Sequence, residues 1–330
     1  MHSALIILDS NSLEVIYGET LCCELAGKVR LLEKPLTAEQ ARSRPELLSE
    51  VEVIFSGWGA PILDAAFLAA APKLKAFFYG AGSIRAFTTE DFWARGITIS
   101  SAYAMNAVPV AEFTLATILL SLKNFWKHSL AAKREARFAP RTHCAGAYGS
   151  KAGIISLGMI GRMVRERLRP FDLKVLAYDP FVTPEQAKTL DIESVSLEEI
   201  FRQCDVVSLH APWLKETEGM IKGTHFEMMK PDATFINTAR GAVVNELEMI
   251  DVLRRRPDLQ VVLDVTHPEP PAADSPLWVL PNVVLTPHIA GSMDGECRRM
   301  GQLMIDEYGR WSRGEKLLWA INKAQAALMA

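Results

Sequence analysis

The sequence lacks a large excess of charge of either sign and lacks a long apolar run. Its 330 residues include 36 Lys and Arg against 39 Asp and Glu, a net charge of −3, which gives no general attraction for nucleic acid or an anionic membrane. The apolar stretch TLATILLSL, between Glu112 and Lys123, is too short to span a bilayer. The first apolar run reaches Asp9 too soon for a signal peptide. We therefore expect neither a nucleic-acid partner nor a membrane partner.

Metal-ligand patterns are also missing. The five cysteines (Cys22, Cys23, Cys144, Cys204 and Cys297) lack metal-type spacing, and the seven histidines include no H-E-x-x-H pair. An odd number of unpatterned cysteines is typical of thiols in a reducing cytosol. The sequence thus predicts no metal and a cytoplasmic location.

Short β-branched runs alternate with helix-type segments through the first third of the chain. The strand candidates are ALIILD, KVRLLE, VEVIFSG, LKAFFYG and ITISSA. The helix-type segments between them include TAEQARSRPELLSE, DAAFLAAAPKL and TTEDFWARG, two of them opened by Asp or Thr as caps. Such alternation predicts a parallel sheet with helices on both faces.

A long helix is predicted over residues 107–138, after which Pro140 and CAGAYGSK break the chain. The alternation then restarts, with strands AGIIS, LKVLAYD, DVVSLH, TFINTA, QVVLDV and NVVLTPH separated by helical segments. A hydrophobic content of 49% with 23% charged residues is globular, and the length allows two domains. The fold class predicted is α/β, with two doubly wound parallel-sheet domains.

The stretch GIISLGMIGR nearly matches the dinucleotide-binding phrase G-x-G-x-x-G, with Ser156, Gly158 and Gly161 at the three positions. A strand precedes this turn and a helix follows it, so the helix amides are placed to hold a pyrophosphate. Serine at the first position is unfavourable if that backbone needs a positive φ. The next strand ends in Asp179, a carboxylate that would accept from a ribose 2′-hydroxyl. No Lys or Arg follows in DPFVTPEQA, so NAD is predicted rather than NADP.

Three later stretches, FINTARGAVVNE, VVLDVTHPEP and NVVLTPHIAG, follow predicted strands and bring polar side chains to one sheet edge. Together with AMNAVPVAEFTLATIL and SLHAPWLKET, they resemble the D-2-hydroxyacid dehydrogenase family over nearly the whole chain. The resemblance implies that His288 is the acid–base group, Glu269 its carboxylate partner and Arg240 the substrate anchor. Glu269 also argues against the related formate dehydrogenases, which carry Gln there.

These three roles agree with elementary chemistry. Reduction of a 2-oxo acid adds a hydride to carbon and a proton to oxygen, and histidine is suited to proton transfer near neutral pH. A nearby carboxylate favours imidazolium and fixes the ring tautomer. A guanidinium matches a carboxylate with two donors and stabilises charge on the carbonyl oxygen. His267 could be mistaken for the base, but no other feature points to it.

The resemblance also implies where the ligands bind. Asp264 and Ala239 would approach the nicotinamide carboxamide, and the amides of the FFYGAGSIR loop would hold the substrate carboxylate. The implied cofactor residues are Ser156, Gly158, Met159, Ile160, Gly161, Asp179, His210, Ala211, Pro212, Thr217, Thr238, Ala239, Arg240, Asp264 and His288. The implied substrate residues are Trp58, Gly80, Ala81, Gly82, Arg240 and His288.

Domain organisation follows the family as well. A flavodoxin-like substrate domain, residues 1–105 and 293–330, would enclose a Rossmann NAD-binding domain, residues 106–292. The long helix from Ala107 and the segment GECRRMGQLMIDEYGRW would be the two crossings, and a homodimer built on that helix is expected. Two departures from the family, Thr266 and Asn245, are expected to affect loop packing and a helix cap.

Substrate identity is less constrained. IFSGWGAP contains no Lys or Arg, Arg85 is the only nearby cation, and the chain stops at Ala330 without room for a regulatory domain. We expect an unphosphorylated small 2-oxo acid, such as glyoxylate, hydroxypyruvate or a larger apolar analogue. The alternative is an NAD-sensing binding protein like the C-terminal-binding-protein corepressors; turnover of 2-oxo acids with NADH distinguishes the two.

Overall fold

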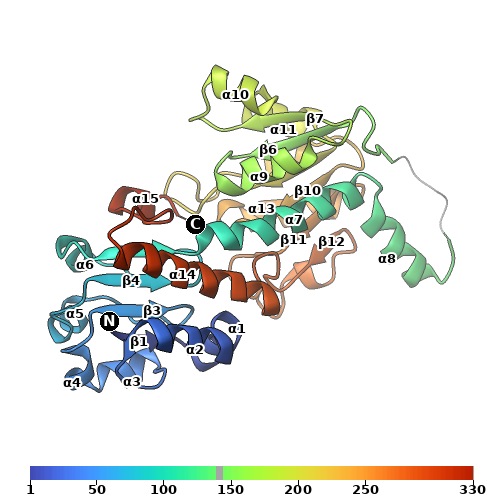
Figure 1. Cartoon of the computed structure of the whole chain (residues 1–330). Coiled ribbons are helices and arrows are strands. Elements are labelled where there is room, and N and C mark those ends of the chain that lie inside the picture. Colours follow the sequence, from blue (N-terminus) through green and yellow to red (C-terminus); the bar gives the residue numbers. More distant parts are fainter. Residues whose placement is uncertain (139–143, 330) are drawn as a thin grey trace. The chain divides into compact units, whose positions relative to one another are not determined.

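The computed structural model describes residues 1–138 and 144–329 (Figure 1). It divides into two compact units: Met1–Ala107 with Ser292–Met329, called unit 1, and Val108–Gly291, called unit 2. Each unit contains one parallel sheet with helices. Which unit binds which ligand stays a prediction.

Unit 1 is built on a five-stranded sheet in the order β2-β1-β3-β4-β5, which is the flavodoxin-like order. Alternate residues of each strand enter two separate hydrophobic clusters: Leu5 and Ile54 join one, Ile6 and Phe55 the other. Both faces are therefore buried, as expected for a parallel sheet. The strands are β1 (Ser3–Ile7), β2 (Arg30–Leu31), β3 (Val53–Ser56), β4 (Ala76–Tyr79) and β5 (Thr98–Ser101).

Eight helices cover this sheet within the described residues. Asp or Thr caps were predicted for two of the three helix-type segments, and all three are capped: Thr37, Asp64 and Thr89 each accept from a backbone amide of the helix's first turn. Sequence periodicity missed the first two helices, and the segment from Thr37 is two short helices because Pro45 starts a new one. The helices are α1 (Ser10–Ile16), α2 (Gly18–Lys28), α3 (Ala38–Arg42), α4 (Pro45–Leu48), α5 (Ala65–Ala70), α6 (Glu90–Ala94), α14 (Cys297–Ser312) and α15 (Lys323–Ala327).

Unit 2 has a seven-stranded sheet in the order β12-β11-β10-β9-β6-β7-β8. The order reverses between β6 and β9, the switch point where a Rossmann sheet binds its dinucleotide. The predicted fold class, two doubly wound parallel sheets, is thus confirmed. The strands are β6 (Lys151–Ile155), β7 (Lys174–Tyr178), β8 (Glu193–Ser194), β9 (Val206–Leu209), β10 (Thr234–Asn237), β11 (Gln260–Leu263) and β12 (Val283–Leu285).

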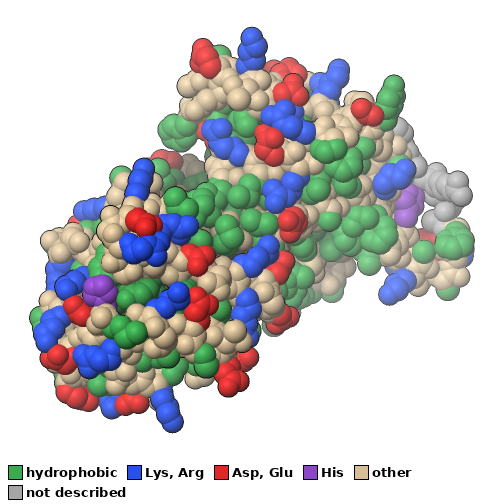
Figure 2. All heavy atoms as spheres, in the orientation of Figure 1, with side chains coloured by type: hydrophobic (Ala, Val, Ile, Leu, Met, Phe, Trp, Pro, Cys, Tyr) green, Lys and Arg blue, Asp and Glu red, His purple; other side chains and the backbone are tan. Residues whose placement is uncertain are grey.

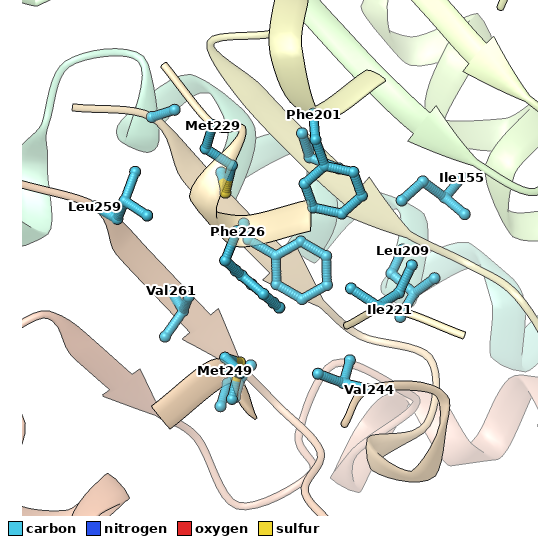
Figure 3. Packing of buried hydrophobic residues seen from close by; sticks show 14 of the residues in the cluster. Ile155, Phe201, Leu209, Ile221, Phe226, Met229, Val244, Met249, Leu259 and Val261 are labelled. Atoms are coloured by element: carbon cyan, nitrogen blue, oxygen red, sulfur yellow. The ribbon is translucent and has the colours of Figure 1, made fainter. Parts of the chain in front are cut away.

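The helices of unit 2 bury apolar faces against this sheet. Phe201 and Phe226 lie edge to face in one of its two cores, with ring centroids 6.0 Å apart (Figure 3). The ring of Phe235 stacks on Phe201 at 6.0 Å and lies edge to face with Phe226 at 5.1 Å. Sequence periodicity missed α10 and the short edge strand β8. The helices are α9 (Met159–Leu168), α10 (Pro184–Leu190), α11 (Leu197–Gln203), α12 (Gly223–Glu227) and α13 (Glu246–Arg255).

The predicted helix over residues 107–138 is wrong in its extent. It is two helices, α7 (Tyr103–Ser121) and α8 (Phe125–Glu135). The chain between them turns at Asn124, whose left-handed backbone (φ 50°) cannot continue a right-handed helix. Pro140, which was expected to end the helix, lies outside the described residues.

α7 is more apolar than the short stretch considered in the sequence. By length and composition it could cross a membrane, but half of its most apolar window is buried, as in a core helix of a soluble protein. Figure 2 shows hydrophobic side chains gathered along its exposed side. The expected absence of a membrane partner stays a prediction.

Candidate active site

The turn from β6 to α9 carries the near-match to the dinucleotide phrase. Ser156 has a left-handed backbone, with φ 74°, the conformation that favours glycine at this position. A Cβ on Gly161 would lie 2.2 Å from the Ser156 carbonyl oxygen, so this glycine is required by the packing itself. A Cβ on Gly158 would meet no atom within 4 Å. The turn therefore leaves open space beside the first amides of α9, which begin at Met159 and Ile160.

Asp179 lies directly after β7, beside this turn. Its Oδ2 accepts from the Leu157 amide at 2.7 Å and its Oδ1 from the Phe181 amide at 2.8 Å. The carboxylate is half-buried. A carboxylate has about four lone-pair sites, so both oxygens keep acceptor capacity for a ligand.

Residues 210–217, which follow β9, form a loop held by internal hydrogen bonds. His210 continues the sheet ladder by donating its amide to the Ile155 carbonyl, and burial lowers the pKa of its imidazole to about 3. The ring is therefore neutral, with Nε2 lying 3.0 Å from the Ser208 hydroxyl. Ala211 is buried, and the Thr217 hydroxyl donates to the Pro212 carbonyl at 2.5 Å. Thr217 holds this loop's shape.

Arg240 is positioned by a turn at the end of β10. Asn237, which the sequence interpretation did not single out, accepts from the Ala239 amide at 2.9 Å and donates to the Arg240 carbonyl at 3.1 Å. Thr238 and Ala239 are buried. Asn237 could have been found from the sequence, because an Asn at the end of a strand often hydrogen-bonds the backbone two residues further on and so forms a turn.

The Arg240 side chain is half-buried. Burial lowers its pKa, and the nearby Glu269 raises it; an arginine remains positively charged nonetheless. Its Nη1 donates to the Ala239 carbonyl at 2.6 Å. Within the described residues it forms no salt bridge, and a half-buried cation of this kind favours binding of an anion.

His288 follows β12 and points its Nδ1 at Glu269. The distance from Nδ1 to Glu269 Oε1 is 2.6 Å, so Nδ1 donates to the carboxylate and Nε2 is left for proton exchange. Both side chains are exposed. Glu269 thus acts on two groups, by a hydrogen bond on His288 and by its charge on Arg240.

Asp264 fixes the backbone around His288. Its buried carboxylate accepts from the Thr286 hydroxyl at 2.6 Å and from the amides of Ile289 and Ala290 at 2.8 and 2.9 Å. His288 itself has a positive φ of 55° and donates its amide to the Asp264 carbonyl. The histidine is therefore held in a conformation that is unusual for its residue type.

His267, and the two residues that depart from the family pattern, Asn245 and Thr266, each have a structural role of their own. The ring of His267 packs edge-on against Trp213, with centroids 5.2 Å apart, and it lines a cavity of about 590 Å³ that does not include His288 or Arg240. Asn245 caps α13 by accepting from the Glu248 amide, as predicted. The Thr266 hydroxyl donates to the Pro268 carbonyl at 2.8 Å, inside the loop.

The predicted substrate residues of unit 1 follow β3 and β4. Ser101 donates its hydroxyl to the carbonyls of Ala81 and Gly82 at 2.9 and 2.5 Å, which turns these carbonyls inward. In the described chain the amides of Ala81 and Gly82 donate to no other backbone group. A Cβ on Gly80 would come within 2.8 Å of Ile16. Trp58 is 39% exposed.

The comparison with known families decides the identity of unit 2. Residues 115–290, more than half of the chain, match the family model described as D-isomer specific 2-hydroxyacid dehydrogenase, NAD binding domain. The chain belongs to the D-isomer specific 2-hydroxyacid dehydrogenase family. The cofactor of this domain is NAD, in agreement with the sequence prediction.

Two curated relatives illustrate what this chain is similar to. D-3-phosphoglycerate dehydrogenase of Archaeoglobus fulgidus is 29% identical over 94% of this chain and 59% of the relative. Glyoxylate reductase of Korarchaeum cryptofilum is 30% identical over 77% of each chain. The chain spans about half the length of the phosphoglycerate dehydrogenases it matches, between 43% and 59%.

Solved structures of the family share the fold. D-mandelate dehydrogenase of Rhodotorula graminis superposes with a TM-score of 0.80 over 98% of both chains at 22% identity. The NAD-complexed D-isomer specific 2-hydroxyacid dehydrogenase of Lactobacillus delbrueckii superposes with a TM-score of 0.78, covering 97% of this chain and 100% of the other, at 20% identity. At such identities the likeness concerns the fold alone.

The residues of the turn from β6 to α9 in this 2-hydroxyacid dehydrogenase are suited to bind NAD. The open space at Gly158 adjoins the N-terminus of α9, where amides and the helix dipole favour a pyrophosphate. Asp179 keeps acceptors for a ribose, and residues 179–187 contain no Lys or Arg to neutralise a 2′-phosphate. These features belong to unit 2 alone and are independent of the placement of unit 1.

Proposed function

We propose that the protein is an NAD-dependent oxidoreductase that interconverts a small 2-oxo acid and its D-2-hydroxy acid. The observation that carries the proposal is the 2.6 Å contact between His288 and Glu269. This contact lies at the strand edge of an NAD-binding domain, together with a desolvated arginine. The family membership supports it.

Bound NAD supplies or accepts the hydride. In reduction, His288 gives the proton on Nε2 to the carbonyl oxygen, and the Nδ1–H contact with Glu269 stabilises the ring's charged form beforehand. Arg240 binds the substrate carboxylate with its two-pronged guanidinium and stabilises developing negative charge on the carbonyl oxygen. In oxidation His288 takes the hydroxyl proton back.

We propose an unphosphorylated substrate. The loop from Ser56 to Pro61 offers no cation for a phosphate, and Trp58 exposes apolar surface there. Arg85, which follows the FFYGAGSI loop in the sequence, donates to the carbonyl of Met329 at 3.2 Å. Among the names carried by the relatives, glyoxylate reductase fits this reading better than phosphoglycerate dehydrogenase.

We propose a cytoplasmic homodimer built on α7. Phe113, Leu119 and Leu120 are half-exposed on this helix, and none of the residues of α8 is buried. The five free cysteines support a reducing compartment. A monomer found by light scattering at micromolar concentration would contradict the dimer.

Turnover tests the function itself. Purified protein is mixed with NADH and a panel of 2-oxo acids, namely glyoxylate, hydroxypyruvate, 3-phosphohydroxypyruvate and apolar analogues, and NADH oxidation is followed by absorbance. We expect turnover with unphosphorylated acids and a preference for NADH over NADPH. Binding of NADH without turnover of any acid would instead support the corepressor-like alternative.

A further inference from the structure

Ser156 has the left-handed backbone for which the family phrase places glycine. A residue with a Cβ pays a conformational penalty there, because the Cβ crowds the following carbonyl oxygen. Ser156 nevertheless has φ 74°. Other contacts must therefore hold the turn in the shape that the cofactor requires.

Two hydrogen bonds to the neighbouring strand end, and the small size of Gly161, shape the turn. The Ser156 amide donates to the Tyr178 carbonyl at 2.8 Å, and the Leu157 amide donates to Asp179 at 2.7 Å. The absence of a Cβ at Gly161 leaves room for the Ser156 carbonyl. The two hydrogen bonds fix the amides of Ser156 and Leu157, and Gly161 makes room for the carbonyl of Ser156. None of these features binds the carbonyl of Leu157.

Arg162 supplies that contact. It lies in the first turn of α9, and its Nε donates to the Leu157 carbonyl at 2.8 Å. Leu157 is buried in the core formed with Val164 and Leu168 of the same helix. The peptide between Leu157 and Gly158 is thereby held at its carbonyl by a cation, a hydrogen bond stronger than one between neutral groups.

We infer that Arg162 is a positioning residue for the cofactor, which compensates for serine at the first position of the dinucleotide phrase. Its guanidinium keeps the peptide between Leu157 and Gly158, which leads from Ser156 into α9, in place, so the amides of α9 remain set for the pyrophosphate. This inference rests on the proposed binding of NAD at the turn and assigns no catalytic step to Arg162.

A double-mutant cycle tests the inference. The proteins are wild type, Arg162→Ala, Ser156→Gly and the double variant, with Arg169→Ala as control because Arg169 lies at the far end of the helix and pairs with Glu166. The dissociation constant of NADH is measured by fluorescence titration. The midpoint of urea unfolding without ligand verifies that each variant folds.

We expect Arg162→Ala to raise the NADH dissociation constant about 10-fold, and Arg169→Ala to leave it within about 2-fold. In the Ser156→Gly background, the effect of Arg162→Ala should fall to about 2-fold, because glycine adopts the turn without support. Equal effects in both backgrounds would mean that Arg162 acts by its charge on the ligand, and would overturn the inference, as would an unchanged constant in Arg162→Ala.

The readout separates this inference from the proposed function. NADH binding does not depend on oxo-acid turnover, so a protein that binds NADH without reducing any acid loses the proposed function and still completes the cycle. A wild-type protein that fails to bind NADH overturns both.

Discussion

Two turns of unit 2 share one design: the cofactor turn after β6 and the histidine turn after β12. Each places a residue other than glycine at positive φ, Ser156 at 74° and His288 at 55°. Each is held by an aspartate that follows the neighbouring strand, Asp179 after β7 and Asp264 after β11. Strained backbone of this kind persists only where surrounding contacts determine it, and it concentrates at functional sites.

The two turns differ in how deeply the aspartate is buried and in how many hydrogen bonds it accepts. Asp264 is 2% exposed and accepts three hydrogen bonds from the histidine turn. Asp179 is half-buried, accepts two amide hydrogen bonds and is followed by Phe181, which is 88% exposed. The histidine turn is thus a rigid support for a reacting side chain, whereas the cofactor turn keeps acceptors available for a ligand.

The largest expected effect removes the side chain that the rigid turn supports. His288→Ala should lower kcat for 2-oxo acid reduction by about 10²–10⁴-fold, the range for a positioned acid–base group. NADH binding should stay within about 2-fold, because the cofactor turn is separate. Stopped-flow turnover and NADH titration measure the two quantities. A full kcat in this variant would remove His288 from the mechanism.

The support itself is tested by Asp264→Asn. An amide nitrogen cannot accept hydrogen bonds, so at least one of the three donors from the histidine turn loses its partner. We expect kcat to fall by about 10²-fold, because a small misplacement of a reacting group has effects of that size, with a lower Tm by calorimetry. An unchanged kcat with a lowered Tm would assign Asp264 to stability alone.

The open turn is tested by Asp179→Ala. Loss of the carboxylate removes a ribose acceptor and the contact with Leu157, so the KM for NADH should rise about 10-fold. The preference for NADH over NADPH should narrow, since the 2′-phosphate is no longer repelled. The KM for the oxo acid serves as the control and should change little. If the wild-type protein prefers NADPH, the prediction that Asp179 selects NAD over NADP is wrong.

The smallest effect concerns the partner of His288. Glu269→Gln keeps the shape of the side chain but removes its charge, so the imidazolium form of His288 is less favoured. The alkaline limb of kcat/KM for reduction should move to lower pH. Superimposable pH profiles of wild type and variant would mean that the two residues are not coupled.

Local pattern in the sequence was sufficient for much of the fold. Short β-branched runs located every central strand, and the caps Thr37, Asp64, Thr89 and Asn245 were readable because capping involves residues three apart. Short elements were missed, including α1, α10 and β8, because a few residues carry too weak a period. The break at Asn124 was missed because apolar spacing continues across it.

The site residues divide in the same way. The order of the motifs pointed to Arg240, Glu269 and His288, whose catalytic roles remain proposals, while the NAD cofactor follows from the family. The contact between His288 and Glu269, the carbonyl held by Arg162 and the turn held by Asn237 were visible only in the fold.

The sequence by itself determined the alternation of strands and helices, the strand ends at which polar residues stand and the phrase that marks a dinucleotide turn. The tertiary structure alone decided that Asp179 holds the turn of Ser156 and Asp264 that of His288. These pairings depend on which parallel strands are neighbours, and strand order is set by crossover connections and burial of both sheet faces, not by local periodicity.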